Sequence, residues 1–275
     1  YGLSPRRSAG QNLVVDPNTV DRIVAAAALH PTDTVVEFGP GFGSLTFALA
    51  DVVERVVAIE IDAGFVDVLR DRSGGRDDVE IIHADGARVD LERVLEGAPG
   101  RLVANLPYNV ATPLVMHALA CPGIQDAFVM VQREVGERWA AGPGEPLRAA
   151  ISVKLDLIAD VQIAFAVPRT VFFPVPQVDS VMVKITRRVD APVGEELSLT
   201  VALVEIAFAQ RRKTLRNNLR TQIPLETLDR IAAEVGLDLS VRAETVATET
   251  FRQVAASLRN LGLDLPVVRP SRQGT

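Results

Sequence analysis

A glycine-rich turn is the first feature of this sequence that could do chemistry. Residues 37–43 read E-F-G-P-G-F-G and follow a short apolar run that is predicted to be a strand. Glycines let the backbone approach a ligand closely beyond the end of a strand. The spacing of Gly39, Gly41 and Gly43 is G-x-G-x-G, whereas pyrophosphate sites use G-x-G-x-x-G, and Pro40 removes one amide donor. The turn therefore favours a ligand without phosphates.

Two acidic residues extend this predicted site. Glu60 ends the second predicted strand, where a carboxylate can accept hydrogen bonds from both hydroxyls of a ribose. Asp85 follows the third predicted strand, in a position to accept a hydrogen bond from an adenine amino group. Either residue alone could be a solvated acid at a strand end. In this order, after the glycine turn, they predict an adenosyl pocket.

The fourth predicted strand ends in the motif N-L-P-Y. The lone pair of the adenine N6 amine is delocalised into the ring, which makes this amine a poor nucleophile. Two acceptors for its protons, the Asn105 side-chain oxygen and the Leu106 carbonyl, would favour a pyramidal nitrogen and return the lone pair. Pro107 would stiffen the turn, and the Tyr108 ring could stack on the base. With S-adenosylmethionine as the methyl donor, methylation would need no metal. The N-L-P-Y motif could also be only a strand-to-helix turn.

The elements that must position these residues alternate along the chain. Several predicted strands are apolar nearly throughout, as expected when both faces of a sheet are covered. Strands alternating with helices predict an α/β fold with a doubly wound, mostly parallel sheet. The predicted strands are 34–38, 55–60, 79–83, 101–105 and 127–132, and the predicted helices are 17–29 (with Asp16 as N-cap), 44–52, 64–70 and 111–119.

The pattern changes after residue 160. Residues 161–166 and 179–186 flank a proline-containing loop and predict an antiparallel hairpin at the sheet edge. Pro192 and Gly194 mark a hinge into a small all-helical region. We expect helices over 195–209, 212–222, 225–235 and 248–260. The predicted domains are a catalytic domain over 1–190, a helical RNA-recognition domain over 191–265 and a flexible tail over 266–275.

Composition restricts the kind of protein. The single cysteine, Cys121, excludes an intramolecular disulfide, and the three histidines lack metal-ligand spacing, so we expect no metal. No apolar run approaches the roughly 18 residues that cross a bilayer, and no signal-peptide pattern precedes residue 30. We therefore expect a cytoplasmic protein with no membrane segment, and nothing in the sequence demands a dimer.

The net charge of −6 is unfavourable for binding RNA, but the charge is unevenly distributed. Five basic side chains fall within ten residues that contain no acid. A local patch of this kind can attract a polyanion even on an acidic molecule. The candidate RNA-binding residues are Arg211, Arg212, Lys213, Arg216 and Arg220.

These motifs together resemble the KsgA-type ribosomal RNA adenine N6-dimethyltransferases over nearly the whole chain. The resemblance implies the class I S-adenosylmethionine-dependent methyltransferase fold. One departure is Arg148-Ala149, where members usually carry Tyr-Gly. The matching segments are residues 8–13, 37–46, 58–62, 105–109, 131–135, 172–180 and 208–217.

The resemblance also implies roles for particular residues. Phe172 would stack on the target base opposite Tyr108 and would complete a catalytic set with Asn105, Leu106 and Pro107. Gly39 and Asn105 would contact the methionine part of the cofactor. The residues expected to bind S-adenosylmethionine are Gln11, Asn12, Leu13, Gly39, Gly41, Gly43, Glu60, Ile61, Asp85, Gly86 and Asn105.

The implied reaction is dimethylation of two adjacent adenines in the 3′-terminal hairpin of small-subunit (16S) rRNA, within a maturing ribosomal subunit. One alternative is a macrolide-resistance-type methyltransferase that acts on 23S rRNA. Leu106, where such enzymes typically have Ile, and the basic run favour the small subunit. The other alternative is a ribosome-assembly factor that acts mainly by binding.

Overall fold

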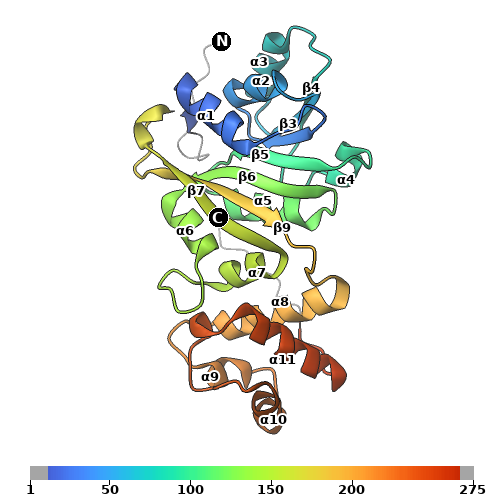
Figure 1. Cartoon of the computed structure of the whole chain (residues 1–275), viewed down its shortest axis with the longest axis vertical. Helices are drawn as coiled ribbons and strands as arrows, with labels where there is room; N and C mark the ends of the chain where they lie inside the picture. The colour runs from blue at the N-terminus through green and yellow to red at the C-terminus, as the bar shows by residue number, and fades with distance from the viewer. Residues whose placement is uncertain (1–11, 267–275) are drawn as a thin grey trace. The chain divides into compact units, whose positions relative to one another are not determined.

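The computed structural model describes residues 12–266, and the chain divides into two compact units (Figure 1). Within the described residues, the sheet unit comprises residues 12–136 and 161–187, and the helical unit comprises residues 137–160 and 188–266. The predicted domain boundary at residue 190 lies close to the point between Arg187 and Arg188 where the chain leaves the sheet unit for the helical unit. The helical unit also takes in residues 137–160, however, which the sequence analysis assigned to the catalytic domain.

A seven-stranded sheet forms the centre of the sheet unit, in the order β4-β3-β2-β5-β6-β9-β7. The pairs β2/β3, β3/β4, β2/β5 and β5/β6 are parallel, and β9 runs antiparallel to β6. This confirms the predicted fold class, and Figure 1 shows β5, β6, β9 and β7 side by side. The strands are β2 (Thr34–Phe38), β3 (Arg55–Glu60), β4 (Val79–His83), β5 (Gly100–Asn105), β6 (Ile124–Gln132), β7 (Ala159–Val167) and β9 (Ser180–Arg187).

The strand order fixes where a ligand can bind. From β2 the chain moves outward to β3 and β4, and then returns to place β5 on the opposite side of β2. The connections after β2 and β5 therefore leave in opposite directions and open a crevice at the carboxyl ends of these strands. The glycine turn follows β2 and the N-L-P-Y motif follows β5.

Three helices of the sheet unit begin at aspartate caps. The Asp16 carboxylate accepts from the Thr19 amide at 2.8 Å, as predicted, and Asp62 and Asp90 cap two later helices. The short helix after Asp90 was not predicted. The helices are α1 (Pro17–Ala27), α2 (Ser44–Ala50), α3 (Ala63–Ser73), α4 (Leu91–Leu95), α5 (Ala111–Ala120) and α6 (Arg133–Ala140), whose last residues belong to the helical unit.

A two-stranded antiparallel sheet, which the sequence did not reveal, closes the start of the described chain onto a late segment. β1 (Leu13–Val14) pairs with β8 (Phe172–Phe173), and Leu13 lies opposite Phe173. Two residues are too few to show a period in sequence, so the pairing depends on the rest of the fold. Its effect is to fix the backbone that leads into β1 beside the crevice.

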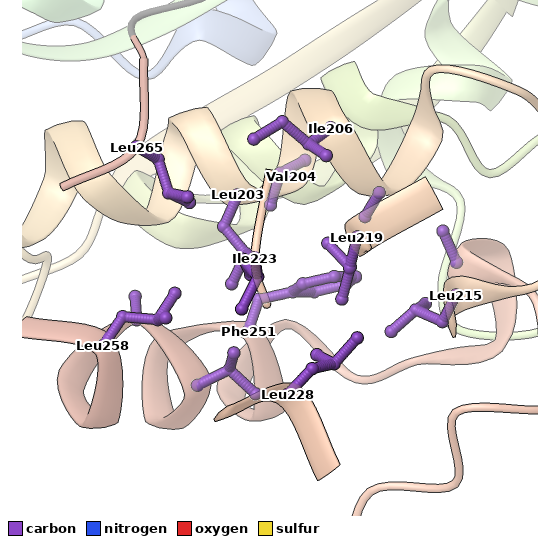
Figure 2. Close-up of a cluster of buried hydrophobic side chains, with 14 of the residues drawn as sticks. Leu203, Val204, Ile206, Leu215, Leu219, Ile223, Leu228, Phe251, Leu258 and Leu265 are labelled. Carbon is purple, nitrogen blue, oxygen red and sulfur yellow. The ribbon is translucent and has the colours of Figure 1, made fainter. Parts of the chain in front are cut away.

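The helical unit has its own hydrophobic core. α8 (Gly194–Phe208) packs against α7 (Ala150–Ile158), α9 (Leu215–Leu219) and α11 (Thr248–Asn260), while α10 (Leu225–Val235) packs against α11. Figure 2 shows the Phe251 ring among Leu219, Ile223 and Leu228. In the described part of the chain, no helix is long and apolar enough to cross a bilayer.

One helix boundary differs from the prediction. A helix was expected over 212–222, but α9 begins only at Leu215, and Arg211 to Lys213 lie in a turn. Thr214 is the N-cap: its hydroxyl accepts from the Asn217 amide. The basic run therefore precedes the helix for most of its length.

Arg148, at the departure from the family pattern, is buried in the helical unit. Its side chain is 2% exposed and donates to the carbonyls of Ala141 (2.9 Å) and Val246 (3.3 Å) and to the Thr248 hydroxyl (3.0 Å). Burial lowers the pKa of this guanidinium. Arg148 thus ties the loop before α7 to the start of α11.

Replacing this residue should destabilise the helical unit. Arg148→Ala leaves two buried carbonyls without donors, and we expect the free energy of unfolding to fall by about 2–4 kcal/mol. Trp139, the single tryptophan, is 2% exposed in this unit, so its fluorescence during urea unfolding reports the change. The exposed Arg259→Ala variant is the control. Equal midpoints for the two variants would contradict this role.

Candidate cofactor and catalytic site

The turns after β2 and β5 touch at the crevice. Gly39 has φ +69°, and a Cβ there would lie 3.3 Å from the Pro107 Cγ. The Gly39 amide donates to the Ile59 carbonyl at 3.0 Å, which fixes the turn against β3. Glycine is required here both by the left-handed backbone and by the close approach.

Gly41 and Gly43 serve different purposes. A Cβ on Gly41, at φ +58°, would overlap the Leu13 side chain, and the Gly41 amide donates to Glu60 Oε2 at 3.2 Å. Gly43 is the residue before α2, and a Cβ there would meet Phe47 and Leu69. Gly43, predicted to bind cofactor, does not line the cavity and has a packing role.

A cavity of about 390 Å³ lies between the two turns. This size suits a small-molecule ligand. The lining combines apolar side chains with a few polar groups, and its charged side chains are both acidic. The lining residues are Asn12, Leu13, Phe38, Gly39, Gly41, Ile59, Glu60, Ile61, Phe65, Asp85, Gly86, Ala87, Asn105, Leu106, Pro107, Asn109, Val110, Pro113 and Leu114.

Most residues predicted to bind cofactor line this cavity. Gln11 lies outside the described residues. The sequence analysis missed the apolar wall formed by Phe38, Phe65 and Leu114, because apolar residues at strand ends and in helices also pack in cores. Phe38 directly precedes the first glycine of the turn, Phe65 follows Glu60, and Leu114 follows N-L-P-Y. This proximity to the motifs was the available signal.

Glu60 is 4% exposed, and backbone donors hold its carboxylate in place. It accepts from the amides of Gly41 (3.2 Å), Ile61 (2.9 Å) and Asp62 (2.9 Å). A carboxylate offers about four acceptor positions, so about one is left for a ligand hydroxyl. Burial raises the pKa of Glu60, and the three amides oppose that effect.

Asp85, which follows β4, also lines the cavity. Its Oδ1 accepts from the Ala87 amide at 3.0 Å, and its Oδ2 lies 3.4 Å from the Arg88 Nε. A Cβ on the adjacent Gly86 would lie 2.8 Å from a Phe38 ring carbon. The site thus offers a carboxylate acceptor next to the apolar Phe38 ring, a pairing that suits a purine with one amino group.

Asn105 supplies the most specific feature of the site. Its Nδ2 donates to the Asn12 carbonyl at 2.7 Å, while its Oδ1 is buried and has no hydrogen-bond partner among the described residues. An unpartnered buried acceptor costs about 1–3 kcal/mol unless a ligand pairs with it. The Asn105 oxygen is therefore available for an N–H donor from a bound molecule.

The two aromatic residues predicted to clamp the base are not equivalent. Tyr108 is half-buried, and its hydroxyl lies 2.6 Å from the Ser180 Oγ; burial raises its pKa. Phe172 was predicted to stack on the target base, but its ring is 1% exposed and belongs to a buried hydrophobic cluster that includes Val14 of β1. The next residue, Phe173, is 59% exposed, since neighbouring strand residues point to opposite faces.

The predicted RNA-binding side chains of the helical unit are all exposed. Arg216 pairs with Asp229 at 2.7 Å, and Arg211 donates to the Pro146 carbonyl. For Arg212, Lys213 and Arg220, no carboxylate within residues 12–266 lies at ion-pair distance. Three cations of this group are thus free to meet phosphates.

Comparisons with known proteins show the family to which the chain belongs. The family model described as ribosomal RNA adenine dimethylase matches residues 2–260. The chain belongs to this family. A relative from Rhodococcus opacus, named ribosomal RNA small subunit methyltransferase A, is 44% identical over 94% of this chain and 90% of its own length. The chain is thus an S-adenosylmethionine-dependent methyltransferase.

Two solved structures are also similar. A dimethyladenosine transferase from Plasmodium falciparum has a TM-score of 0.78 at 23% identity and covers 92% of this chain and 99% of its own. The 23S rRNA methyltransferase ErmE has a TM-score of 0.71 at 25% identity, covering 90% of this chain and all of its own. The similarity to the Plasmodium falciparum structure supports the methyltransferase fold of this chain.

Gly41 offers a direct test of the cavity. In Gly41→Ala, the left-handed backbone and the overlap with Leu13 should distort the turn and weaken S-adenosylmethionine binding by about tenfold or more. Gly75→Ala is a matched control, because Gly75 also has a positive φ (+83°) but faces open space. Isothermal titration calorimetry measures both affinities, and equal losses would show that backbone strain alone is responsible.

Proposed function

We propose that this protein dimethylates N6 of two adjacent adenines in the 3′-terminal hairpin of 16S rRNA, as part of small-subunit maturation. The unpartnered Asn105 oxygen in the cavity is the observation that supports adenine N6 methylation most directly. The name of the 44% identical relative supports the small-subunit target. This substrate would place the reaction in the cytoplasm, with the protein acting as a monomer.

In this proposal Asn105 and Leu106 activate the amine. The Asn105 Oδ1 accepts a hydrogen bond from one N6–H, and the Leu106 carbonyl accepts one from the other, which makes the nitrogen pyramidal and localises its lone pair. Asn12 holds the amide of Asn105 with its oxygen available, through the 2.7 Å hydrogen bond to Nδ2. S-adenosylmethionine supplies the activated methyl group when bound. The same acceptors serve the second methylation through the remaining proton.

The other cavity residues would hold the cofactor. We propose that Glu60 accepts from a ribose hydroxyl with its remaining acceptor position, and that Asp85 accepts from the adenine amino group. Leu13 and Gly41 would flank the methionine part, where they are already in contact distance of one another. Gln11 is retained as a proposed cofactor ligand.

The target base needs walls as well as acceptors. Tyr108 is proposed as one wall, positioned by its hydrogen bond to Ser180. Phe172 would serve as the second wall only if β8 moved, because its ring is enclosed. In the described conformation Phe173 presents the open ring of this segment.

The alternatives make different predictions. A 23S rRNA target is represented by ErmE, at 25% identity, against 44% for the small-subunit relative. An assembly factor acting mainly by binding does not need a buried, unpartnered acceptor that faces a ligand cavity. Labelled S-adenosylmethionine with subunits that lack adenine dimethylation separates the three: label in 16S, label in 23S, or binding without label.

Asn105→Ala tests the chemical step in that assay. Loss of the acceptor should reduce turnover on small subunits by about 10²–10³-fold or more, while cofactor affinity changes only a few-fold. The label should disappear from N6,N6-dimethyladenosine in nuclease digests of 16S rRNA. Asn260→Ala, on the exposed end of α11, is the control. Undiminished turnover in Asn105→Ala would rule out the proposed mechanism.

The basic turn tests recognition. Replacing Arg212 and Lys213 together by Ala removes two unpaired cations, and the KM for the subunit should rise about tenfold or more with kcat unchanged at saturation. The slope of log KM against log salt concentration should also decrease by the amount expected for the loss of about two phosphate contacts. Arg259→Ala controls for loss of charge elsewhere. An unchanged salt dependence would show that the turn does not meet phosphates.

A further inference from the structure

A second buried carboxyl lies behind the glycine turn. Glu37, in β2, is 2% exposed and does not line the cavity. The Thr46 hydroxyl of α2 donates to its Oε2 at 2.5 Å. Neither the adenosyl pocket nor the activation of the amine uses this residue.

Glu37 and Glu60 occupy the ends of neighbouring parallel strands. Glu37 lies opposite Ala58 in the register, two residues before Glu60, and the turn containing Gly39 and Gly41 connects the two sites. Among the described residues, Glu60 is the charged group whose field acts on Glu37. Two buried acids close together cannot both carry charge without a compensating cation.

The two acids are stabilised unequally. Glu60 accepts from three backbone amides, which favour its ionised form. Glu37 has one hydroxyl donor, and burial together with the Glu60 carboxylate raises the pKa of Glu37 to about 8. At neutral pH Glu60 therefore carries the charge, and Glu37 is mostly protonated.

Within residues 12–266, no basic side chain lines the cavity. Its charged lining residues are Glu60 and Asp85, both acidic. S-adenosylmethionine brings a sulfonium and an ammonium against one carboxylate, whereas the demethylated product has lost the sulfonium charge. A ligand with a net positive charge is thus the compensating group that these acids lack.

We infer that Glu37 is a positioning residue that releases its proton when S-adenosylmethionine binds and takes a proton up again once the methyl group has left. The Thr46 hydroxyl stabilises the ionised form. Because the demethylated product lacks the sulfonium, it cannot hold Glu37 ionised to the same degree. The protein therefore binds the methyl donor more tightly than the demethylated product. This inference rests on the proposed cofactor site and does not depend on which RNA is methylated.

Proton release on binding determines how the affinity for S-adenosylmethionine changes with pH. Binding releases a proton, so affinity for S-adenosylmethionine should rise as the pH increases, by up to about tenfold per pH unit below pH 8, and should level off above it. Affinity for S-adenosylhomocysteine should depend on pH much less. Glu37→Gln keeps an acceptor for Thr46 but cannot ionise, and its affinity for S-adenosylmethionine should lose this pH dependence.

Calorimetry counts the protons directly. Titrations of the full chain at pH 7 in phosphate and in Tris, which differ in ionisation enthalpy, should show net proton release with S-adenosylmethionine, and this release should become much smaller at pH 9. Release with S-adenosylhomocysteine should be clearly smaller. Glu37→Gln should release almost none, and the exposed Asp67→Asn variant should match the wild type.

Each outcome decides the matter. Equal proton release for the two ligands in the wild type, or wild-type release by Glu37→Gln, would overturn the inference, and the wild-type comparison holds even if the variant does not fold. Thr46→Val, which removes the donor, should selectively weaken binding of S-adenosylmethionine. Absence of binding by either ligand would count instead against the cofactor site itself.

Discussion

The site depends on one buried amide that is only half satisfied. Asn105 is held by its nitrogen to the Asn12 carbonyl, and its oxygen has no partner in the described chain. Folding leaves that acceptor desolvated at a cost of about 1–3 kcal/mol, which the hydrogen-bond donor of a substrate would recover on binding. The arrangement requires that Asn12 stay in place, and the pairing of β1 with β8 provides this by joining the start of the described chain to residues 172–173. A small sheet of four residues is thus a direct support of the proposed chemistry.

The strand order explains why cofactor and amine acceptors meet. β2 and β5 are neighbours in the sheet, but the chain continues from β2 to β3 on one side and from β5 to β6 on the other. The loops that follow β2 and β5 therefore diverge and leave a crevice between them. Gly39 and Pro107 close its floor at near-contact distance. Any side chain at Gly39 would push the N-L-P-Y turn outward and move the amine acceptors away from the methyl donor, where a displacement of about 1 Å already costs catalysis.

Strand ends were predictable, whereas burial and pairing were not. Glu60 and Asn105 were identified because β-branched runs mark strands, and parallel strands in a doubly wound sheet end at one edge. Phe172 was expected to stack on the target base. Whether its ring or that of Phe173 faces the core depends on a one-residue register with β1, which no local pattern specifies. The helix expected from residue 212 begins instead after Thr214, because a threonine that can cap the first turn overrides the helical propensity of basic residues.

The charge distribution reconciles an acidic protein with a polyanionic substrate. The cofactor cavity has acidic charged residues because its ligand is a cation, and acids near a phosphate backbone would repel RNA. The unpaired cations Arg212, Lys213 and Arg220 belong to the helical unit, whereas Glu60 and Asp85 belong to the sheet unit. Opposite electrostatic requirements are thus met by separate units of one chain, each with its own core. Net charge, which averages over both, then says little about either ligand, and a substitution that adds charge should be judged by the unit that receives it.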